Sequence, residues 1–341
     1  MISAALVGGA GYIGGELLRL LLGHPRVEPV AVVSSRLGGK RVDGVHPNLR
    51  GITDLTFCSQ SELGRYDVLF LASAHGSTMA LLPELADRAK TVIDLSGDFR
   101  LTDPAVYARH YGTEHSAPEL LGDFVSGAPE LARDELRGAD RIAVPGCMAT
   151  AAILALRPLA AEGLIEPDVM IDARTGSSGS GATAGQMNLH AERSGAMRVF
   201  APAGHRHEAE IAQACGVRPT MTATGVEAVR GVQVLCRAVV RDAVDERDVR
   251  RAYRKHYADE PFVRIVAQRR GAYRLPEPKI LLGSNFCDVG FALRAEARQV
   301  LAVAALDNLV KGGAGNAVQS LNIRMGWPER LGLEFPGLHP A

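Results

Sequence analysis

Gly8-Gly9-Ala10-Gly11-Tyr12-Ile13-Gly14 is the stretch that decides the fold of this 341-residue chain. It continues the strand-like run SAALVGG and precedes GELLRLLLGH, whose apolar residues recur at helical spacing. Glycine between a first strand and a first helix lets the backbone turn tightly and approach a pyrophosphate, which the amides and dipole of the helix N-terminus stabilise. An ordinary tight turn is the alternative. The placement favours a dinucleotide site formed by Gly8, Gly11, Tyr12, Ile13 and Gly14.

Further strand-like runs follow this loop and alternate with helical patterns. They are near-continuous apolar segments at residues 29–35, 67–73, 91–96 and 141–147. Such runs are typical of strands buried on both faces of a parallel sheet. We therefore expect a doubly wound α/β domain, a Rossmann fold, in the first half of the chain.

The pattern changes after residue 147. A helical segment at 150–163 is followed by strand-like runs at 168–175, 220–229, 231–240 and 287–296, with one more helical segment at 245–258. Strands grouped around few helices predict an α+β domain. A helical pattern from Asn308 to Met325 is expected to pack against the first domain. We therefore predict a nucleotide-binding domain of residues 1–147 with 308–341, and a catalytic and dimerisation domain of residues 148–307.

Bulk properties narrow the class of protein. The chain is 47% apolar and 22% charged, with 38 basic and 38 acidic residues, so no global field would recruit nucleic acid or a membrane. No run of eighteen apolar residues and no signal peptide is present. The five cysteines are widely spaced and form no CxxC pair, which argues against a disulfide framework or a zinc site. We expect an enzyme of the reducing cytoplasm.

The end of the second strand predicts which dinucleotide binds. NAD enzymes usually place Asp or Glu about 20 residues after the glycines, on the ribose 2′-hydroxyl. Here the chain has Ser34, Ser35 and Arg36, followed by Lys40. No carboxylate repels a 2′-phosphate, and a guanidinium can hold one through two hydrogen bonds. These residues favour NADP, with a merely solvated Arg36 as the alternative.

Cys147 is the candidate nucleophile. It lies in Val144-Pro145-Gly146-Cys147-Met148-Ala149-Thr150, at the junction of a strand and a helix. Free amides at a helix N-terminus lower the pKa of a thiol and make the thiolate available near neutral pH. The other four cysteines are interpreted as inert core residues.

His205 and His207 are candidates for the base that such a nucleophile needs. They lie two residues apart in Gly204-His205-Arg206-His207-Glu208-Ala209-Glu210. One of them could exchange protons with the sulfur and later with the product oxygen. A zinc pair lacks a third ligand nearby, and a purely structural turn stays open.

Three further segments carry groups suited to an anion or to the cofactor. Arg100 ends the segment DLSGDFR and could bind a phosphate or carboxylate of the substrate. The glycine-serine loop 175–181 could offer backbone amides, and we assign Ser177 to the substrate and Ser178 and Gly179 to the cofactor. The amide of Asn308 could orient a nicotinamide. Each segment could also be an ordinary turn, and Ser96 a helix cap.

Together these segments resemble one family, the N-acetyl-gamma-glutamyl-phosphate reductases. The matching segments occur in order over nearly the whole chain and are GGAGYIGGELLRLL, SSR, HPNLRG, DLSGDFRL, PGCMATAAILAL, GHRHEAEI and LDNLVKGGAGNAVQSLN. The resemblance implies a Rossmann domain joined to a glyceraldehyde-phosphate-dehydrogenase-like catalytic domain, and a homo-oligomer, either a dimer or a tetramer. It also implies that Cys147 attacks an acyl phosphate, that NADPH reduces the thioester, and that His205 handles the protons while His207 contacts substrate.

Within that family the segments 322–329, 335–340 and 273–278 are more similar to the lysine-pathway branch. Those enzymes reduce L-2-aminoadipate 6-phosphate while a small acidic amino-group carrier protein holds it. From Arg247 to Lys279 the chain has ten basic and four acidic residues, which could attract an acidic carrier or could form a solvated face. Met148 departs from this branch, in which the nucleophile is followed by Asn.

Other functions stay open at the level of the sequence. One is the arginine-pathway reduction of free N-acetylglutamyl phosphate, alone or together with the lysine-pathway reaction. Aspartate-semialdehyde dehydrogenase uses the same chemistry but fits the GHRH motif and the tail less well. A non-catalytic NADP-binding sensor is an alternative of another class, against which Cys147 argues.

Overall fold

The computed structural model describes residues 1–341, and the contacts divide the chain into two compact units. Unit 1 comprises Met1–Pro145 and Gly313–Glu334, and unit 2 comprises Gly146–Gly312 and Phe335–Ala341. The expected boundaries differ from this division. Cys147 and residues 308–312 belong to unit 2, and so do the last seven residues.

The C-terminal segment belongs to unit 2 because its rings and backbone pack there. A Cβ added to Gly283 would lie 3.1 Å from the Phe335 ring. The rings of Tyr273 and His339 lie 5.6 Å apart. Segments of small and aromatic residues of this kind carry no periodicity, so the surface that they contact could not be predicted from the sequence.

Unit 1 contains a seven-stranded parallel sheet in the order β3-β2-β1-β4-β5-β7-β6. Its strands are β1 (Ile2–Val7), β2 (Val27–Val33), β3 (Phe57–Cys58), β4 (Tyr66–Leu71), β5 (Ala89–Asp94), β6 (Val125–Ser126) and β7 (Arg141–Ala143). The five apolar runs expected in this half correspond to β1, β2, β4, β5 and β7. The α/β fold is thus confirmed. The two strands that were not expected, β3 and β6, are the shortest and form the two edges of the sheet.

The helices of unit 1 are α1 (Tyr12–Leu22), α2 (Thr78–Leu85), α3 (Pro104–Tyr111), α4 (Pro129–Leu136) and α9 (Gly315–Arg324). The tail helix α9 packs against α1 and α4. Some of the polar side chains that it buries are hydrogen-bonded. Asn322, for example, lies 3.0 Å from Nε2 of His24 and donates to the carbonyls of Glu329 and Leu331. None of the helices in the chain has the length and apolar character needed to cross a membrane.

Unit 2 contains a mixed seven-stranded sheet in the order β12-β13-β14-β11-β8-β10-β9. Its strands are β8 (Ile165–Thr175), β9 (Arg198–Ala201), β10 (Arg218–Gly225), β11 (Val232–Val240), β12 (Val263–Ile265), β13 (Cys287–Arg294) and β14 (Gln299–Leu306). The pairs β8–β10 and β12–β13 are parallel and the other pairs antiparallel. The expected α+β architecture is confirmed, although β9, β12 and β14 were not anticipated.

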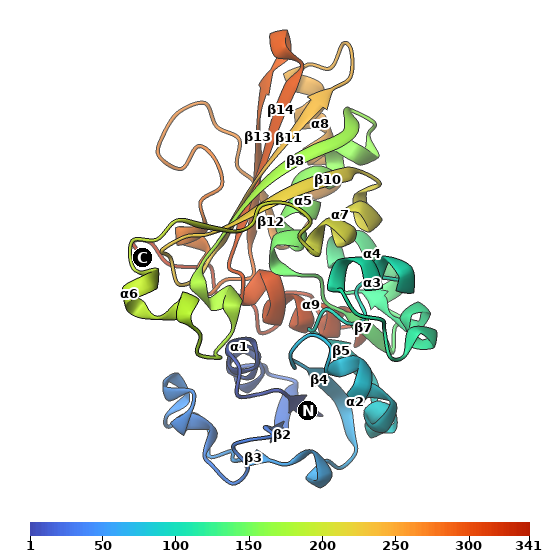
Figure 1. Cartoon of the computed structure of the whole chain (residues 1–341), viewed down its shortest axis with the longest axis vertical. Coiled ribbons are helices and arrows are strands. Elements are labelled where there is room, and N and C mark those ends of the chain that lie inside the picture. The colour runs from blue at the N-terminus through green and yellow to red at the C-terminus, as the bar shows by residue number, and fades with distance from the viewer. The chain divides into compact units, whose positions relative to one another are not determined.

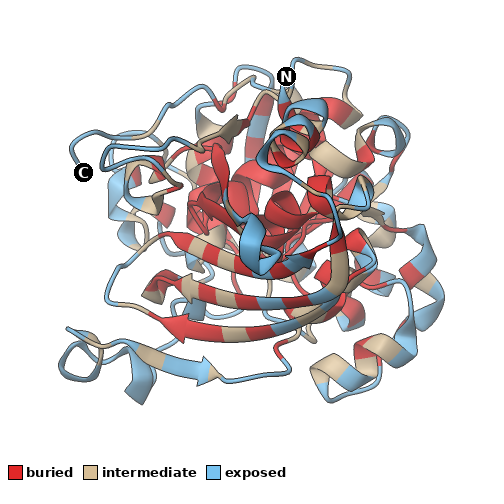
Figure 2. Cartoon of the chain, turned by 90° about the horizontal axis from the view of Figure 1, so that it is seen from above, coloured by how far each residue is buried: buried red, intermediate tan, exposed pale blue.

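Helix α5 (Cys147–Ala161) covers one face of this sheet and is flanked by α7 (His207–Cys215) and α8 (Glu246–Tyr257) (Figure 1). Buried and exposed residues alternate along strands such as β11, in which every second residue from Val232 to Val240 is buried (Figure 2). On the opposite face, Met170 of β8 is 70% exposed and Val239 of β11 is 44% exposed. Alternation of this kind marks a sheet with one packed and one open face. The short helix α6 (His190–Arg193) precedes β9.

Candidate active site

Cys147 is the first residue of α5, and the fold of unit 2 holds it in place. Gly146, the residue before the helix, is extended at φ −66° and ψ 151°, and the Thr150 amide donates to its carbonyl over 2.7 Å. The helix behind Cys147 is anchored because the residues from Met148 to Leu156 are all buried. The thiol is half-buried and the chain forms no disulfide. A helix N-terminus stabilises a thiolate through its unpaired amides and its dipole.

Gly312, which is distant from Cys147 in the sequence, packs against it in the structure. A Cβ added at position 312 would lie 2.5 Å from Cβ and 3.0 Å from Cα of Cys147. Gly312 lies in a single π-helical turn, Val310–Ala314, and its amide donates to the Asp307 carbonyl over 3.0 Å. Turns of this type often occur at functional sites because they redirect the backbone. Only glycine leaves room for the nucleophile here.

His207 and Glu210 lie beside the residue that precedes the nucleophile. A Cβ at Gly146 would overlap the imidazole of His207, so the ring packs directly against this backbone. The Glu210 carboxylate accepts the Gly146 amide over 2.8 Å, and its other oxygen lies 3.8 Å from Nε2 of His207. Both side chains are about 95% buried. This carboxylate therefore holds the backbone at the start of α5 and can attract a proton on His207.

His205 is also buried, and its environment differs from that of His207. Burial, together with the charge of Arg206, lowers the pKa of His205 to about 4. The His207 amide donates to Nδ1 of His205 over 3.2 Å, and the two rings are 4.5 Å apart at 78°. At neutral pH His205 is thus an uncharged imidazole, which can accept a proton.

Two acidic residues of the same motif, Glu208 and Glu210, hold the histidine segment in place, and neither was predicted from the sequence to have a role. Glu208 accepts the Gly204 amide over 3.1 Å and the Met221 amide over 2.7 Å, which ties the histidine loop to β10. Glu210 performs the task described above. The sequence could have indicated them, because Glu208 and Glu210 lie in the first turn of α7, where negative side chains stabilise a helix.

The glycine-serine loop does not offer its amides to an anion, contrary to our expectation. The amides of Gly176, Ser177, Ser178 and Gly179 all donate to backbone carbonyls of unit 2. A donor that is already paired cannot also bind a phosphate, so an anion could be bound here only by side chains. Of the three residues assigned to ligands, Ser177 is half-buried, Ser178 is buried and Gly179 is exposed.

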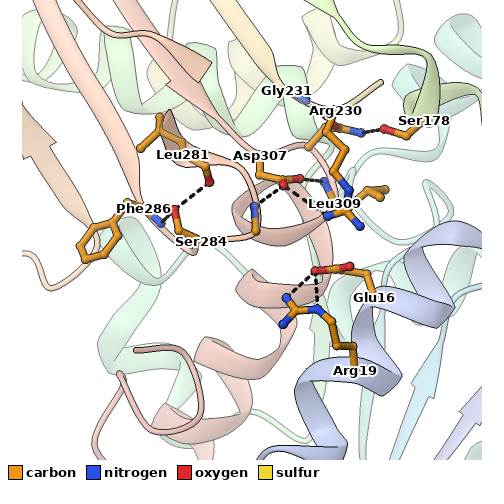
Figure 3. Close-up of polar contacts among 12 residues, drawn as sticks. Glu16, Arg19, Ser178, Arg230, Gly231, Leu281, Ser284, Phe286, Asp307 and Leu309 are labelled. Atoms are coloured by element: carbon orange, nitrogen blue, oxygen red, sulfur yellow. Dashed lines mark hydrogen bonds and ion pairs between the residues drawn. The ribbon is translucent and has the colours of Figure 1, made fainter. Parts of the chain in front are cut away.

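The side chain of Asn308 holds two segments of unit 2 together. Its Nδ2 donates to Oγ of Ser178 over 2.9 Å, and its Oδ1 accepts the Gly231 amide over 2.8 Å. Next to it, the buried carboxylate of Asp307 accepts from the Leu309 amide and pairs with Arg230 at 3.3 Å (Figure 3). These contacts bind the glycine-serine loop to the chain segment that leads to Gly312.

The glycine loop of unit 1 has the geometry of a phosphate site. Gly8 has φ +84°, which glycine adopts without strain. Its Cβ position is also filled, because the Ala72 carbonyl oxygen would lie 2.5 Å away. Helix α1 begins at Tyr12 after Gly11, which supplies no side-chain cap, so the first amides of α1 are not paired within the chain. Unpaired amides of Tyr12, Ile13 and Gly14 fit a pyrophosphate.

Ser34, Ser35 and Arg36 follow the end of β2, as expected. The Ser34 amide donates to the Cys58 carbonyl over 3.1 Å, and its side chain is buried. Ser35 and Arg36 are exposed, and Arg36 makes no hydrogen bond or ion pair within the chain. A guanidinium in this state can bind a phosphate without breaking a contact.

The guanidinium of Arg100 is hydrogen-bonded to the backbone of unit 1. It donates to the carbonyls of Val144 and Leu95 over 2.8 and 3.1 Å. In the same segment burial raises the pKa of Asp94 to about 7, and Ser96 donates to this carboxylate over 2.9 Å. Ser96 is therefore not a helix cap. Asp98 instead caps α2, since it accepts the amide of Met79.

The comparisons with known proteins agree with this geometry. A family model described as "Semialdehyde dehydrogenase, NAD binding domain" matches residues 3–139, and one described as "Semialdehyde dehydrogenase, dimerisation domain" matches residues 147–308. Among solved structures, an aspartate semialdehyde dehydrogenase II of Vibrio cholerae superposes with a TM-score of 0.72 at 17% identity, covering 96% of this chain and 99% of that one. An aspartate semialdehyde dehydrogenase of Candida albicans, solved with NADP, has a TM-score of 0.66 at 14% identity, covering 95% and 98%. These structures share the fold.

The sequence relatives are much closer. The [LysW]-L-2-aminoadipate 6-phosphate reductase of Deinococcus radiodurans is 49% identical, covering 99% of this chain and 98% of that protein. A Pyrococcus horikoshii protein, provisionally named [LysW]-L-2-aminoadipate/[LysW]-L-glutamate phosphate reductase, is 46% identical and covers all of both chains. The chain therefore belongs to the semialdehyde dehydrogenase family of nicotinamide-dinucleotide oxidoreductases, in the group of the [LysW]-L-2-aminoadipate 6-phosphate reductases.

Proposed function

We propose that this protein reduces L-2-aminoadipate 6-phosphate, held on the carrier protein LysW, to the corresponding semialdehyde in lysine biosynthesis. NADPH is the hydride donor and Cys147 the nucleophile. The observation that carries the proposal is a cysteine at the N-terminus of α5, with the buried side chains of His207 and Glu210 against the preceding Gly146 and with His205 next to His207. The names of relatives at 43–49% identity over the full chain support the substrate.

The reaction divides into an acylation and a reduction. In the acylation the Cys147 thiolate attacks the acyl carbon, the bond from that carbon to the phosphate oxygen breaks, and inorganic phosphate leaves with the electron pair. A thioester on Cys147 remains. The bound cofactor supplies the hydride that reduces this thioester. The remaining steps are proton transfers and release of the sulfur, and they depend on residues of the chain.

His205 is proposed as the group that moves the protons. Its imidazole is uncharged at neutral pH because burial lowers its pKa to about 4, so it can first accept the thiol proton. The protonated ring can then donate to the oxygen of the reduced intermediate. It takes this proton back when the carbon–sulfur bond breaks, and the aldehyde and the Cys147 thiolate form.

His207 is a second candidate for the same task. It is the histidine whose ring packs against Gly146, next to the nucleophile, and Glu210 lies 3.8 Å from its Nε2. We also propose that His207 contacts the substrate, together with Ser177.

NADPH rather than NADH is proposed on the basis of Arg36. This exposed guanidinium follows β2 and has no ion-pair partner within the chain, and neither Asp nor Glu follows β2 directly. The 2′-phosphate of NADPH is the anion that it would bind.

The carrier protein is proposed to contact the basic segment Arg247–Lys279, although fewer charges are available than the sequence count suggests. Several of the ten basic side chains already have acidic partners. Arg250 pairs with Glu246, Arg251 with Asp248, Lys255 with Glu162 and Arg264 with Asp288. Exposed charges remain in the loop after β12, where Arg269 is 89% exposed, although it lies 3.9 Å from Glu246, and Arg270 is exposed as well. An acidic carrier would be steered by these residues.

A side-by-side reductase assay tests the proposal. The purified enzyme is given carrier-bound aminoadipyl phosphate, carrier-bound glutamyl phosphate and free N-acetylglutamyl phosphate, each with NADPH. We expect the carrier-bound aminoadipyl substrate to have the highest kcat/KM. Efficient use of free N-acetylglutamyl phosphate with no use of the carrier-bound forms would assign the protein to arginine biosynthesis instead. Activity with both carrier-bound substrates would give it the dual specificity in the name of the Pyrococcus relative.

The Cys147→Ser variant is the control for the chemistry in this assay. An alcohol is a far weaker nucleophile than a thiolate, so reduction should be abolished while NADPH still binds. With wild-type enzyme and acyl phosphate but no NADPH, mass spectrometry should find the acyl adduct on Cys147. Activity in the serine variant would exclude Cys147 as the nucleophile.

A further inference from the structure

The segment HPNLRG, at residues 46–51, has no role in the mechanism above, yet its histidine contacts the glycine loop. Nε2 of His46 lies 2.7 Å from the carbonyl oxygen of Gly9, 37 residues earlier in the chain. A carbonyl can only accept, so Nε2 carries the proton and donates it. We infer that His46 is a positioning residue for the dinucleotide, because it sets the direction of the peptide group between Gly9 and Ala10.

The geometry of the peptide group makes this contact consequential. In a planar trans peptide, the N–H of one residue points opposite to the carbonyl of the residue before it. When His46 holds the Gly9 carbonyl, it also determines where the Ala10 amide points. That amide makes no hydrogen bond within the chain. It lies in the same loop as the unpaired first amides of α1, and with them it can donate to a pyrophosphate.

His46 is itself held rigidly by two turns of the chain. Its amide donates to the Val42 carbonyl and its carbonyl accepts the Leu49 amide, each over 2.9 Å. Val42 and Leu49 are both buried in the core of unit 1, and Pro47 begins the turn between His46 and Leu49. An imidazole fixed in this way loses little freedom when it forms its hydrogen bond, so the contact with Gly9 is stable.

Gly15 completes the arrangement. A Cβ added there would overlap the imidazole of His46, with Nδ1 only 2.5 Å away. The ring therefore packs against the first turn of α1 and can reach Gly9 only while position 15 has no side chain. This pairing gives the inference a test that is specific to the contact, and the test requires dinucleotide binding by unit 1 but neither the carrier nor the acyl phosphate.

The test measures the Kd for NADPH by titration calorimetry, together with Tm and the rate at which iodoacetamide labels Cys147. We expect His46→Ala to raise the Kd about 3- to 10-fold, which corresponds to the loss of one neutral hydrogen bond. His46→Gln should recover most of the affinity, because its amide can donate to the same carbonyl. Labelling of Cys147 should be unchanged in both variants. An unchanged Kd in His46→Ala, or no recovery in His46→Gln, would overturn the inference.

Gly15→Ala provides the matched control through non-additivity. Alone it should weaken NADPH binding, because its methyl group displaces the imidazole, and the gain of alanine in a helix interior should raise Tm only where that ring is absent. In the His46→Ala background the same substitution should cause no further loss of affinity, since there is no ring left to displace. Additive losses in the double variant would show that the two residues act separately and would exclude the contact as the cause. Failure of the reductase assay with all three acyl phosphates would leave these binding results intact, so the two proposals can fail independently.

Discussion

At the scale of single residues, the two histidines of GHRH are distinguished by their surroundings rather than by their spacing. Burial and the cationic Arg206 both disfavour the charged form of His205. His207 instead packs against Gly146, and its Nε2 lies 3.8 Å from the buried carboxylate of Glu210.

The pH dependence of kcat/KM is predicted to identify the base. A base works only when unprotonated, so activity is lost as the pH falls through its pKa in the free enzyme. For His205 this loss should occur near pH 4, because that is where burial places its pKa. An unperturbed histidine would lose activity near about pH 6.5.

The variants His205→Asn and His207→Asn test the same assignment of the base. The first should lower kcat about 10²–10⁴-fold, the range for general acid–base catalysis, and the second should have a smaller effect. The opposite ranking would assign the proton transfers to His207.

Arg36 is predicted to determine the choice between NADPH and NADH. Arg36→Ala should weaken NADPH binding and leave NADH binding almost unchanged, because only NADPH carries the 2′-phosphate that pairs with the guanidinium. The Kd of each cofactor is measured directly. Arg50→Ala, which removes another exposed arginine of unit 1, is the control and should affect neither. Equal losses for both cofactors in Arg36→Ala would mean that the arginine is structural.

At the scale of elements, the start of α5 is supported by two segments, the π-helical turn at Val310–Ala314 and the first turn of α7. The first packs Gly312 against Cys147, and the second places Glu210 on the Gly146 amide. Neither contact involves the sulfur itself. Both set the direction in which α5 begins, and therefore where the nucleophile lies.

Gly312→Ala is predicted to displace Cys147. The added methyl group would lie 2.5 Å from Cβ of Cys147, so either the π-helical turn or the start of α5 must shift. Overpacking of this kind costs about 1–3 kcal/mol of stability. Chemical denaturation should record that loss, and labelling of Cys147 by iodoacetamide should slow. Gly185→Ala, at a position with no atom within 4 Å of the added methyl, is the control. Unchanged labelling in Gly312→Ala would mean that the turn does not position the nucleophile.

At the scale of the whole molecule, the open face of the sheet in unit 2 is the surface that the proposed homo-oligomer would use. Met170 and Val239 lie on this face and are 70% and 44% exposed. Exposed apolar residues on neighbouring strands are typical of an interface between subunits.

Met170→Glu is predicted to weaken self-association, because it places a charge in the centre of that face. The molar mass of the wild type and of the variant is measured by light scattering over a range of concentrations. Met197→Glu changes a residue that is 80% exposed but precedes β9, outside the face, and should leave the mass unchanged. A monomeric wild type, or an unaltered mass in Met170→Glu, would exclude this face as the interface.

Recognition of the carrier gives a second prediction at this scale. Reversing the charges of Arg269 and Arg270 should lower kcat/KM for the carrier-bound substrate more than for a small free acyl phosphate. The difference should shrink as salt is added, because the Debye length is about 8 Å at physiological ionic strength and shorter above it. Arg294→Glu, at an exposed arginine outside this segment, is the control. Equal losses with both substrates would indicate a structural role for the arginine pair.

Much of the fold could be predicted because it depends on signals that are local in the chain. Continuous apolar runs predicted five strands of the parallel sheet, since a strand covered on both faces needs apolar residues at every position. The glycines before α1 predicted the phosphate loop for a similarly local reason, and the turn before Cys147 predicted a helix that begins at the nucleophile. The shortest strands, such as β3 and β6, were not predicted, because two residues carry no periodicity.

What only the tertiary structure decided is which groups surround these elements. Glu210 reaches the Gly146 amide across 64 residues, and His46 reaches Gly9 across 37. The glycine-serine loop was expected to offer its amides to an anion, but those of Gly176, Ser177 and Ser178 donate to carbonyls of another segment, 228–231. Periodicity and turn chemistry act over a few residues, so the sequence by itself determined the longer elements, the glycine loop before α1 and the place of Cys147 at the start of a helix. Contacts between distant segments arise only when those elements pack, and packing alone decided which carboxylates, carbonyls and glycines position the chemistry.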